Sequence, residues 1–276
     1  MTSVLIPKAR IRAFRAKIYR HFRLNGRRLP WRRTRDPYRI LISEVMLQQT
    51  QVERVKSFYA AFLKRFPTVL SLSRAPLVDV LSVWQGLGYN RRAKFLRDAA
   101  RTIVARHGGR VPRDLAALRA LPGVGPYTAG AVRAFAWNEV TPVIETNIRN
   151  VFTYEFFPHR RKVSDAELTP LVEATLDRKN PRRWYAALMD YGAALKKRER
   201  GLNAKNAHYV KQEPFKNSLR EVRGNILAVL TRERRALTER VIAHFSHARI
   251  GKVREAVQSL AKDGLITVSR GRVSLL

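Results

Sequence analysis

One acidic residue, Glu44, lies in an apolar stretch in which an acid is unusual. Its neighbours Ile40, Val45, Met46 and Leu47 are hydrophobic, and their spacing predicts a helix. A glutamate is rarely buried unless it is paired or functional, and burial raises its pKa so that it can donate a proton near neutral pH. The stretch therefore predicts a general acid. The alternative is a solvated glutamate on the polar face of the helix.

A second carboxylate, Glu145, is followed by Thr146 and Asn147 at the expected start of another helix. Two carboxyl groups in different environments can divide acid catalysis and charge stabilisation between them. We expect Glu44 and Glu145 to line one pocket.

A glycine turn at residues 121–125 lies between the two acids and separates two helical patterns, at 115–121 and 129–136. Gly125 tolerates the backbone angles that a hairpin needs. A turn of this kind at a helix N-terminus presents free backbone N–H groups, which suit a DNA phosphate. We expect DNA contacts from Gly123, Val124 and Gly125.

A second glycine turn, Gly86–Tyr89, has an aromatic tip and is followed by Arg91, Arg92 and Lys94. An exposed aromatic residue beside cations can wedge between bases while the cations hold phosphates. Leu87, Tyr89 and Arg91 are therefore expected to contact DNA. An ordinary turn with a tyrosine in the core is the alternative.

Three neutral hydrogen-bonding residues follow Glu44 on the same predicted helix. Such residues are unusual in a core, and they suit contacts to unpaired base edges. The residues are Gln48, Gln49 and Thr50.

The charge of the chain is far from neutral. Its 276 residues include 55 Lys and Arg against 21 Asp and Glu, a formal charge of +34. Such an excess indicates a polyanionic partner, most simply nucleic acid; a basic protein without such a partner is the alternative. The length allows one large domain or two smaller ones, and the 45% hydrophobic residues suffice for a sizeable core.

Several classes of protein are disfavoured. The chain has no cysteine, which excludes disulfides, a thiolate nucleophile and a thiolate metal site. No apolar run approaches the roughly 18 residues of a membrane span, and no signal peptide is visible. We expect no membrane partner and, if the source is prokaryotic, a cytoplasmic, nucleoid-associated monomer.

The first 35 residues are strongly basic, with twelve Lys or Arg and no acid. Ile11, Phe14, Ile18 and Phe22 recur at helical spacing and predict an amphipathic helix that packs on the core. An organelle presequence has a similar composition.

The last sixty residues form a separate pattern. Helices are expected from Leu219 to about Thr231, from an N-cap at Thr238, and from Ile250 to Asp263; a hairpin at 265–275 follows. This order resembles a winged helix, and we place a domain boundary between 1–215 and 216–276. We expect DNA contacts from Arg249, Lys252, Arg254, Arg270 and Arg272. Contacts with another protein are the alternative.

Several motifs in order resemble the helix-hairpin-helix (HhH-GPD) DNA glycosylases, and the MutY-type adenine glycosylases among them most closely. The resemblance runs from about residue 29 to 195. Besides the turn at 121–125 and the acid at 145, it rests on Leu29–Arg32, Asp36–Tyr38, Ser43–Val52, Trp84–Tyr89 and Leu188–Ala193.

The resemblance implies an all-α fold of two helical subdomains with the active site between them. It makes Glu44 the acid that protonates a flipped base. It puts Glu145 where the family has an aspartate that stabilises the sugar cation or forms a transient covalent link to the sugar. Gln49 and Tyr89 match positions that wedge into the duplex. Tyr127 replaces the Schiff-base lysine of bifunctional relatives, so no imine chemistry is expected.

A base pocket is also implied, and we assign to it Trp31, Arg32, Asp190 and Asn147. Asp190 lies in an otherwise apolar helical stretch. From the residues alone it is either a buried acid near the site or a helix cap or salt-bridge partner.

The chain departs from the family in three ways. Glu145 is one methylene longer than aspartate, and a misplacement of about 1 Å can cost on the order of a hundredfold in rate. The four cysteine positions of an iron–sulfur cluster hold Lys196, Asn203, Asn206 and Gln212, so we expect no cluster and no other cofactor. Many relatives carry a Nudix-like C-terminal domain, and we expect the winged-helix pattern in its place here.

The leading hypothesis is therefore a monofunctional glycosylase that acts on a damaged or mismatched base in double-stranded DNA. Adenine opposite 8-oxoguanine is the favoured substrate, and uracil, thymine or a deaminated or alkylated purine is the alternative. A catalytically inactive protein that binds DNA structures belongs to a different class, as does a winged-helix transcription regulator, which explains the last sixty residues alone.

Overall fold

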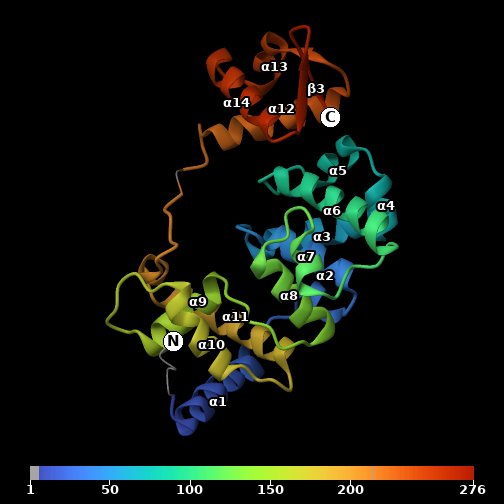
Figure 1. Cartoon of the computed structure of the whole chain (residues 1–276). Helices are drawn as coiled ribbons and strands as arrows, with labels where there is room; N and C mark the ends of the chain where they lie inside the picture. Colours follow the sequence, from blue (N-terminus) through green and yellow to red (C-terminus); the bar gives the residue numbers. More distant parts are fainter. Residues whose placement is uncertain (1–5, 213) are drawn as a thin grey trace. The chain divides into compact units, whose positions relative to one another are not determined.

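The computed structural model describes residues 6–212 and 214–276, and this part of the chain is mainly helical (Figure 1). Residues 1–5, the beginning of the basic N-terminal stretch, lie outside the described residues. The chain divides into two compact units, the first comprising residues 1–40 and 125–211 and the second 41–124 and 212–276.

The first unit is a group of helices around one aromatic core. The basic N-terminal helix is present, as predicted, and it buries Phe14 and Ile18. The ring of Phe14 lies edge-on to those of Phe152 and Trp184. The elements are α1 Lys8–Asn25, η1 Pro30–Arg33, α8 Pro126–Trp137, α9 Thr146–Phe156, α10 Asp165–Thr175, α11 Pro181–Arg198 and η2 Leu202–Lys205.

A glycine sets the close packing of α11 against the start of α9. Gly192 lies in α11, where a Cβ atom would overlap the backbone carbonyl of Asn147. Only glycine therefore lets the two helices approach this closely. The approach fixes the backbone that carries Glu145 and Asn147.

The second unit begins with a helical group. Phe62, Phe66 and Trp84 are fully or almost fully buried in it, with their rings edge to face. Its helices are α2 Pro37–Leu47, whose first residues belong to the first unit, α3 Val52–Arg65, α4 Val69–Arg74, α5 Leu77–Trp84, α6 Arg91–His107 and α7 Leu115–Arg119.

The C-terminal segment, residues 216–276, contains the three helices and the hairpin that the sequence predicts. Thr238 caps its helix through a bond from the Val241 amide, as predicted. Arg270 and Gly271 both have positive φ, as a two-residue hairpin turn requires. The elements are α12 Leu219–Glu233, β1 Leu237–Thr238, α13 Glu239–Ser246, α14 Ile250–Lys262, β2 Ile266–Ser269 and β3 Arg272–Leu275.

The sheet has one strand more than predicted. Its order is β1-β3-β2 with antiparallel pairing. Leu237 pairs with Val273, but a two-residue strand leaves no alternating pattern to recognise. The segment is also joined to the helical group of its own unit, through ion pairs of Arg234 with Asp79 at 3.0 Å and of Arg91 with Asp263 at 3.4 Å.

Among the described residues, no helix combines the length and the apolar character that crossing a membrane requires.

Candidate active site and nucleic-acid interface

Glu44 lies inside α2 and is only 3% exposed. Ser43 and Val45 beside it are buried as well. The interpretation of Glu44 as a solvated glutamate is therefore wrong. Burial of a carboxyl group at this level indicates a structural or chemical role for it.

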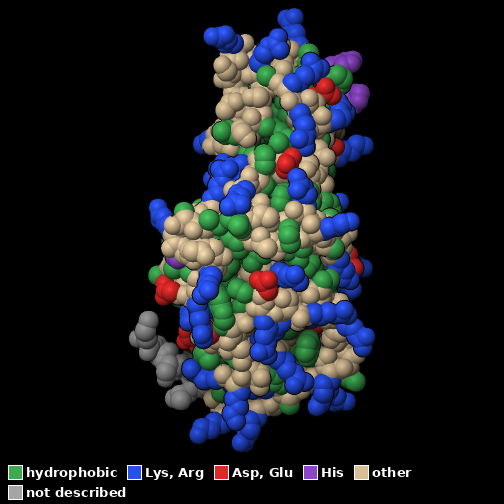
Figure 2. Space-filling view, turned by 90° about the vertical axis from the view of Figure 1, so that its right-hand side faces the viewer, with side chains coloured by type: hydrophobic (Ala, Val, Ile, Leu, Met, Phe, Trp, Pro, Cys, Tyr) green, Lys and Arg blue, Asp and Glu red, His purple; other side chains and the backbone are tan. Residues whose placement is uncertain are grey.

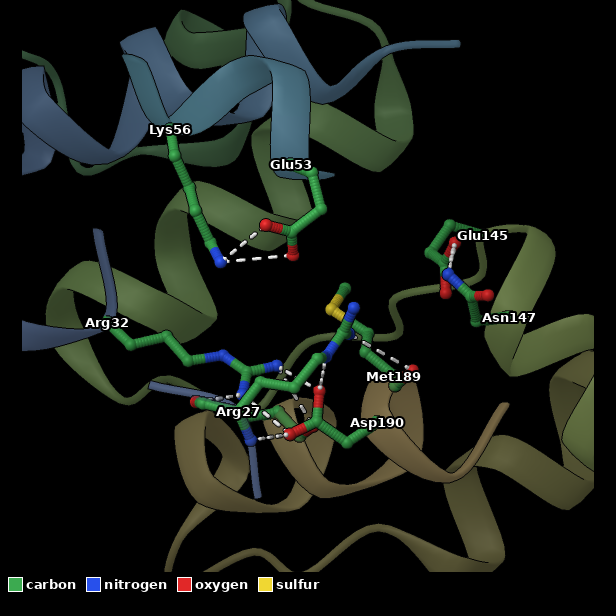
Figure 3. Close-up of polar contacts among 9 residues, drawn as sticks. Arg27, Arg32, Glu53, Lys56, Glu145, Asn147, Met189 and Asp190 are labelled. Atoms are coloured by element: carbon green, nitrogen blue, oxygen red, sulfur yellow. Dashed lines mark hydrogen bonds and ion pairs between the residues drawn. The ribbon is translucent and has the colours of Figure 1, made fainter. Parts of the chain in front are cut away.

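Glu145 is the N-cap residue of α9, and its carboxylate faces the first turn of that helix (Figure 3). Oε1 accepts the backbone N–H of Ile148 at 2.9 Å, and Oε2 accepts the side-chain amide of Asn147 at 3.0 Å. Desolvation raises the pKa of Glu145, although the bonds from Asn147 and Ile148 and the charge of Arg149 favour its ionised form. The carboxylate is thus held in one orientation, in a setting where its charge is costly.

Asp190 is the centre of a buried ion cluster in the first unit (Figure 3). The guanidinium of Arg32 donates to both of its carboxylate oxygens at 2.8 Å. Arg27 donates from its backbone N–H at 2.8 Å and from Nε at 2.6 Å. Burial disfavours the charge, but hydrogen bonds and charge from Arg32 and then from Arg27 outweigh it, and they lower the pKa of Asp190.

Two of the interpretations of Asp190 therefore hold together: it is a buried acid and it is also a salt-bridge partner. Because α11 carries it, the cluster fastens the Leu29–Arg32 segment to that helix. Arg182 adds a second attachment by donating to the backbone carbonyls of Arg32 and Thr34 at 2.8 and 2.6 Å. Trp31 in the same segment is 7% exposed.

Gln48, Gln49 and Thr50 lie beyond the end of α2, which stops at Leu47. The expectation that they continue the helix is wrong, because Gln49 adopts a left-handed backbone with φ of 53°. Its side chain is exposed. A non-glycine residue in this conformation is uncommon and often marks a functional site.

Tyr89 repeats this arrangement in the second glycine turn. Its φ is 49° and it is 38% exposed, so it is not a core tyrosine. Leu87 in the same turn is buried at 2% exposure and serves the core. The turn at residues 48–50 thus exposes the side chain of Gln49, and the turn at residues 86–89 exposes that of Tyr89. We call these two residues the wedge pair.

The side chain of Arg92 forms hydrogen bonds with both the turn at residues 48–50 and the turn at residues 86–89. Its guanidinium donates to the carbonyls of Val45, Met46 and Gln48 at 2.6–2.9 Å, and to Gly88 O and Thr50 Oγ1 at 3.0 Å. Burial lowers the pKa of Arg92 to about 10. The expectation that Arg92 holds phosphates is therefore wrong, since its donors serve the fold.

The neighbouring cations differ from Arg92. Arg91 keeps more than half of its side chain exposed while it pairs with Asp263, and Lys94 bonds Asp98 at 2.7 Å. Arg91 therefore remains a candidate for a phosphate contact.

The turn at 121–125 differs in detail from the expectation. Gly123 takes the positive φ, at 75°, whereas Gly125 has an ordinary extended backbone and caps α8. The amide of Val124 donates to the carbonyl of Leu121 at 3.1 Å, so it is not a free donor in this structure. Tyr127 in the first turn of α8 is half-buried against the core of the first unit.

Basic side chains extend over the face of the molecule in Figure 2, with few acidic ones among them. The basic residues assigned to the C-terminal segment are all exposed. Lys252 donates to the carbonyl of Asn217 at 2.8 Å, and Arg254 pairs with Glu239 at 3.3 Å. Arg249, Arg270 and Arg272 complete this set.

Two of the four positions at which relatives carry cluster cysteines are part of a hydrogen-bonded network. Asn203 Oδ1 accepts the amide of Asn150 at 2.6 Å. Asn206 donates to Asn150 at 2.9 Å and accepts the hydroxyl of Thr153 at 3.1 Å. These side chains fasten the loop that contains η2 to α9.

Sequence reasoning missed three polar partners: Arg27 of the ion cluster, the structural Arg92, and Gln212, which contacts the wedge pair. Arg27 lies in a stretch where basic residues are too common for one to stand out. The other two face partners more than 40 residues away in the chain.

Comparisons with known proteins show what the chain is similar to. A family model described as HhH-GPD superfamily base excision DNA repair protein matches residues 42–173. The adenine DNA glycosylase of Mycolicibacterium smegmatis is 41% identical over 172 residues, which cover 61% of this chain and 58% of that protein. The adenine DNA glycosylase of Buchnera aphidicola subsp. Baizongia pistaciae is 36% identical over 179 residues, covering 64% and 50%.

The chain thus spans about half the length of these curated relatives. A solved structure of a thermostable thymine-DNA glycosylase superposes with a TM-score of 0.60 at 30% identity, covering 67% of this chain and 87% of that one.

Proposed function

The chain belongs to the HhH-GPD superfamily of base excision DNA repair proteins, and from that membership we propose that it is a monofunctional DNA glycosylase. It hydrolyses the N-glycosidic bond of a base flipped out of double-stranded DNA, acting as a monomer. The favoured substrate is adenine opposite 8-oxoguanine. Support for adenine comes from relatives that are named adenine DNA glycosylases.

The observation that carries the proposal is the burial of Glu44 within the segment that the family model matches. Cleavage requires a proton on the departing base. A positioned carboxylic acid can deliver that proton to the departing base. Glu44 supplies that proton.

Glu145 supplies the negative charge that the positively charged sugar needs in the transition state. The bonds from Ile148 and Asn147 hold its carboxylate in place before the substrate arrives. Its raised pKa, caused first by desolvation, means that its ionised form is poorly solvated and gains most from a nearby cation.

The residue at position 127, a tyrosine, determines whether the DNA strand is cleaved after the base has left. A phenol cannot form the imine through which a lysine cleaves the DNA strand. The strand therefore stays intact, and hydrolysis leaves an abasic site.

A second substrate has its own support. The thermostable thymine-DNA glycosylase is covered over 87% of its length, whereas the adenine glycosylases extend well beyond the match. Thymine in a mismatched pair is therefore the second candidate.

We further propose that the protein works without an iron–sulfur cluster. The four positions offer carboxamides and an amine in place of thiolates, and Asn203 and Asn206 are already bonded to Asn150 and Thr153. These residues do not fit the cluster. The purified protein is expected to be colourless with sub-stoichiometric iron; an iron–sulfur absorbance band with stoichiometric iron would overturn this.

The test of function is a panel of duplexes, each with one mismatch or lesion, treated with alkali after incubation. Adenine opposite 8-oxoguanine is expected to yield the most alkali-labile sites, and a mismatched thymine comes second. Binding to these duplexes without any abasic sites would instead identify a catalytically inactive protein.

A further inference from the structure

The wedge pair is hydrogen-bonded to residues from the end of the chain. Gln212 Nε2 donates to Gln49 Oε1 at 2.7 Å and to the Tyr89 hydroxyl at 2.8 Å. Arg220 in the first turn of α12 donates to the same hydroxyl and to Gln212 Oε1, both at 3.2 Å. All four residues belong to the second unit. We call Gln212 and Arg220 the reading pair.

The wedge pair and the reading pair line one cavity. Its volume is about 1020 Å³, at the upper end of the range for small-molecule sites and ample for a nucleotide. Its walls are the two turns, the start of α6 and one side of α12. The reading pair therefore lies beside the residues that we expect to enter a DNA duplex.

Several basic side chains line the cavity. Arg54, Arg91 and Arg223 line it in addition to Arg220, while Asp263 is neutralised by Arg91 and Arg223. Glu221 is the other acid in the lining. Gly224 also lines it, and a Cβ atom there would meet nothing within 4 Å, so the middle of the helix leaves room for a flat ring.

From this arrangement we propose that Gln212 and Arg220 read the base opposite the flipped one, and that they select an oxopurine, guanine or 8-oxoguanine. This rests on the proposed function, because flipping one base leaves its partner with unpaired hydrogen-bonding groups. The two N–H donors of the Gln212 amide bond Gln49 and Tyr89 in this structure, and they become available to a base when that pair moves into a duplex. A guanidinium such as that of Arg220 is the usual partner of the O6 and N7 acceptors of guanine. The opposite base of the favoured substrate, 8-oxoguanine, is itself an oxopurine.

The test uses the full-length protein and duplexes that carry a non-hydrolysable tetrahydrofuran abasic analogue opposite guanine, 8-oxoguanine, adenine, cytosine or thymine. Fluorescence anisotropy gives Kd for each duplex and for a fully paired control. The wild type is expected to bind the oxopurine duplexes about tenfold or more tightly than the pyrimidine ones.

Gln212→Ala and Arg220→Ala are each expected to reduce this preference by about tenfold while leaving the paired duplex almost unaffected. Arg220→Lys separates reading from charge, since lysine keeps the charge but loses the planar fork; it is expected to lose the preference too. Arg232→Ala is the matched control, because it removes one arginine from α12 outside the cavity and should leave the preference intact.

Gly224→Leu tests the cavity itself. Leucine favours a helix more than glycine does, so the variant should fold, and its side chain should weaken binding to every abasic duplex relative to the paired one. Melting curves check that each variant is folded.

The proposal is overturned if Gln212→Ala and Arg220→Ala weaken all duplexes equally, or if Arg220→Lys behaves as the wild type, since either result means that these residues contact phosphates alone. No base is excised in this assay, so a failed glycosylase test does not affect it. If the protein excises a base but Gln212→Ala and Arg220→Ala keep the wild-type preference for the opposite base, this inference is wrong and the proposed function stands.

Discussion

At the N-terminus of α9, Glu145 combines two roles that oppose each other. As an N-cap it accepts the Ile148 amide, which stabilises the helix. As a desolvated charge it weakens the fold at neutral pH, because its pKa in the folded state is raised. A group held for chemistry at the expense of stability is expected at an active site.

The sign of this effect gives a prediction for Glu145→Gln. A glutamate with a raised folded-state pKa contributes most stability when it is protonated, and it loses that contribution as the pH rises through the folded-state pKa. Glutamine resembles the protonated form. The variant should therefore be more stable than the wild type at pH 7.5, and the difference should shrink as the pH falls below the folded-state pKa. Urea denaturation at several pH values measures this; a gain that grows toward acid pH contradicts the assignment.

At the scale of elements, one buried guanidinium organises the wedge pair. Arg92 satisfies the carbonyls that end α2 and the carbonyl of Gly88 in the second turn. Arg92 thereby holds Gln49 and Tyr89 in their left-handed backbone conformations when no DNA is bound.

Arg92→Ala should accordingly destabilise the protein by about 3 kcal/mol or more, since several buried carbonyls lose their donor. DNA binding should weaken as well, because the turns that carry the wedge pair lose the hydrogen bonds from Arg92. Arg91→Ala is the control, with an expected change below about 1 kcal/mol for an exposed pair. Urea denaturation of both variants is the measurement, and equal losses would show that Arg92 has no such role.

The elements show how far the sequence leads. Spacing predicts the helices around Phe14, Glu44 and Val257, because an apolar face repeats along each of them. It cannot predict that α2 stops at Leu47, since that end depends on Arg92, 45 residues away. It gives no sign of the contact between Gln212 and Tyr89, which depends on how a loop folds back.

The same division holds for the candidate site. Glu44 and Glu145 can be found from residue type and local pattern, and Asp190 can be found as an acid in an apolar stretch. Whether Asp190 is neutral or ionised depends on Arg27 and Arg32, which come from a distant segment. Sequence patterns report what is local, whereas the charge state of a buried group is set by the tertiary structure.

At the scale of the whole molecule, the charge of +34 gives the protein a long-range attraction for a polyanion. We predict a steep linear fall of log K with log salt for DNA binding, through release of counterions. Replacing Arg270 and Arg272 at the hairpin tip with alanine should reduce the slope by about 0.9 for each phosphate that the variant no longer neutralises. Anisotropy titrations from low to high salt measure both quantities, and an unchanged slope in the double variant would remove the hairpin from the interface.

The proposed reaction depends above all on the proton that Glu44 delivers to the departing base. Glu44→Gln tests this step, because the substitution removes the transferable proton and keeps the size of the side chain. With enzyme in excess over a duplex that the wild type cleaves, we expect no alkali-labile sites above background, although the variant binds that duplex with wild-type affinity. Abasic sites formed by Glu44→Gln at the wild-type rate would contradict the role of Glu44 as the acid.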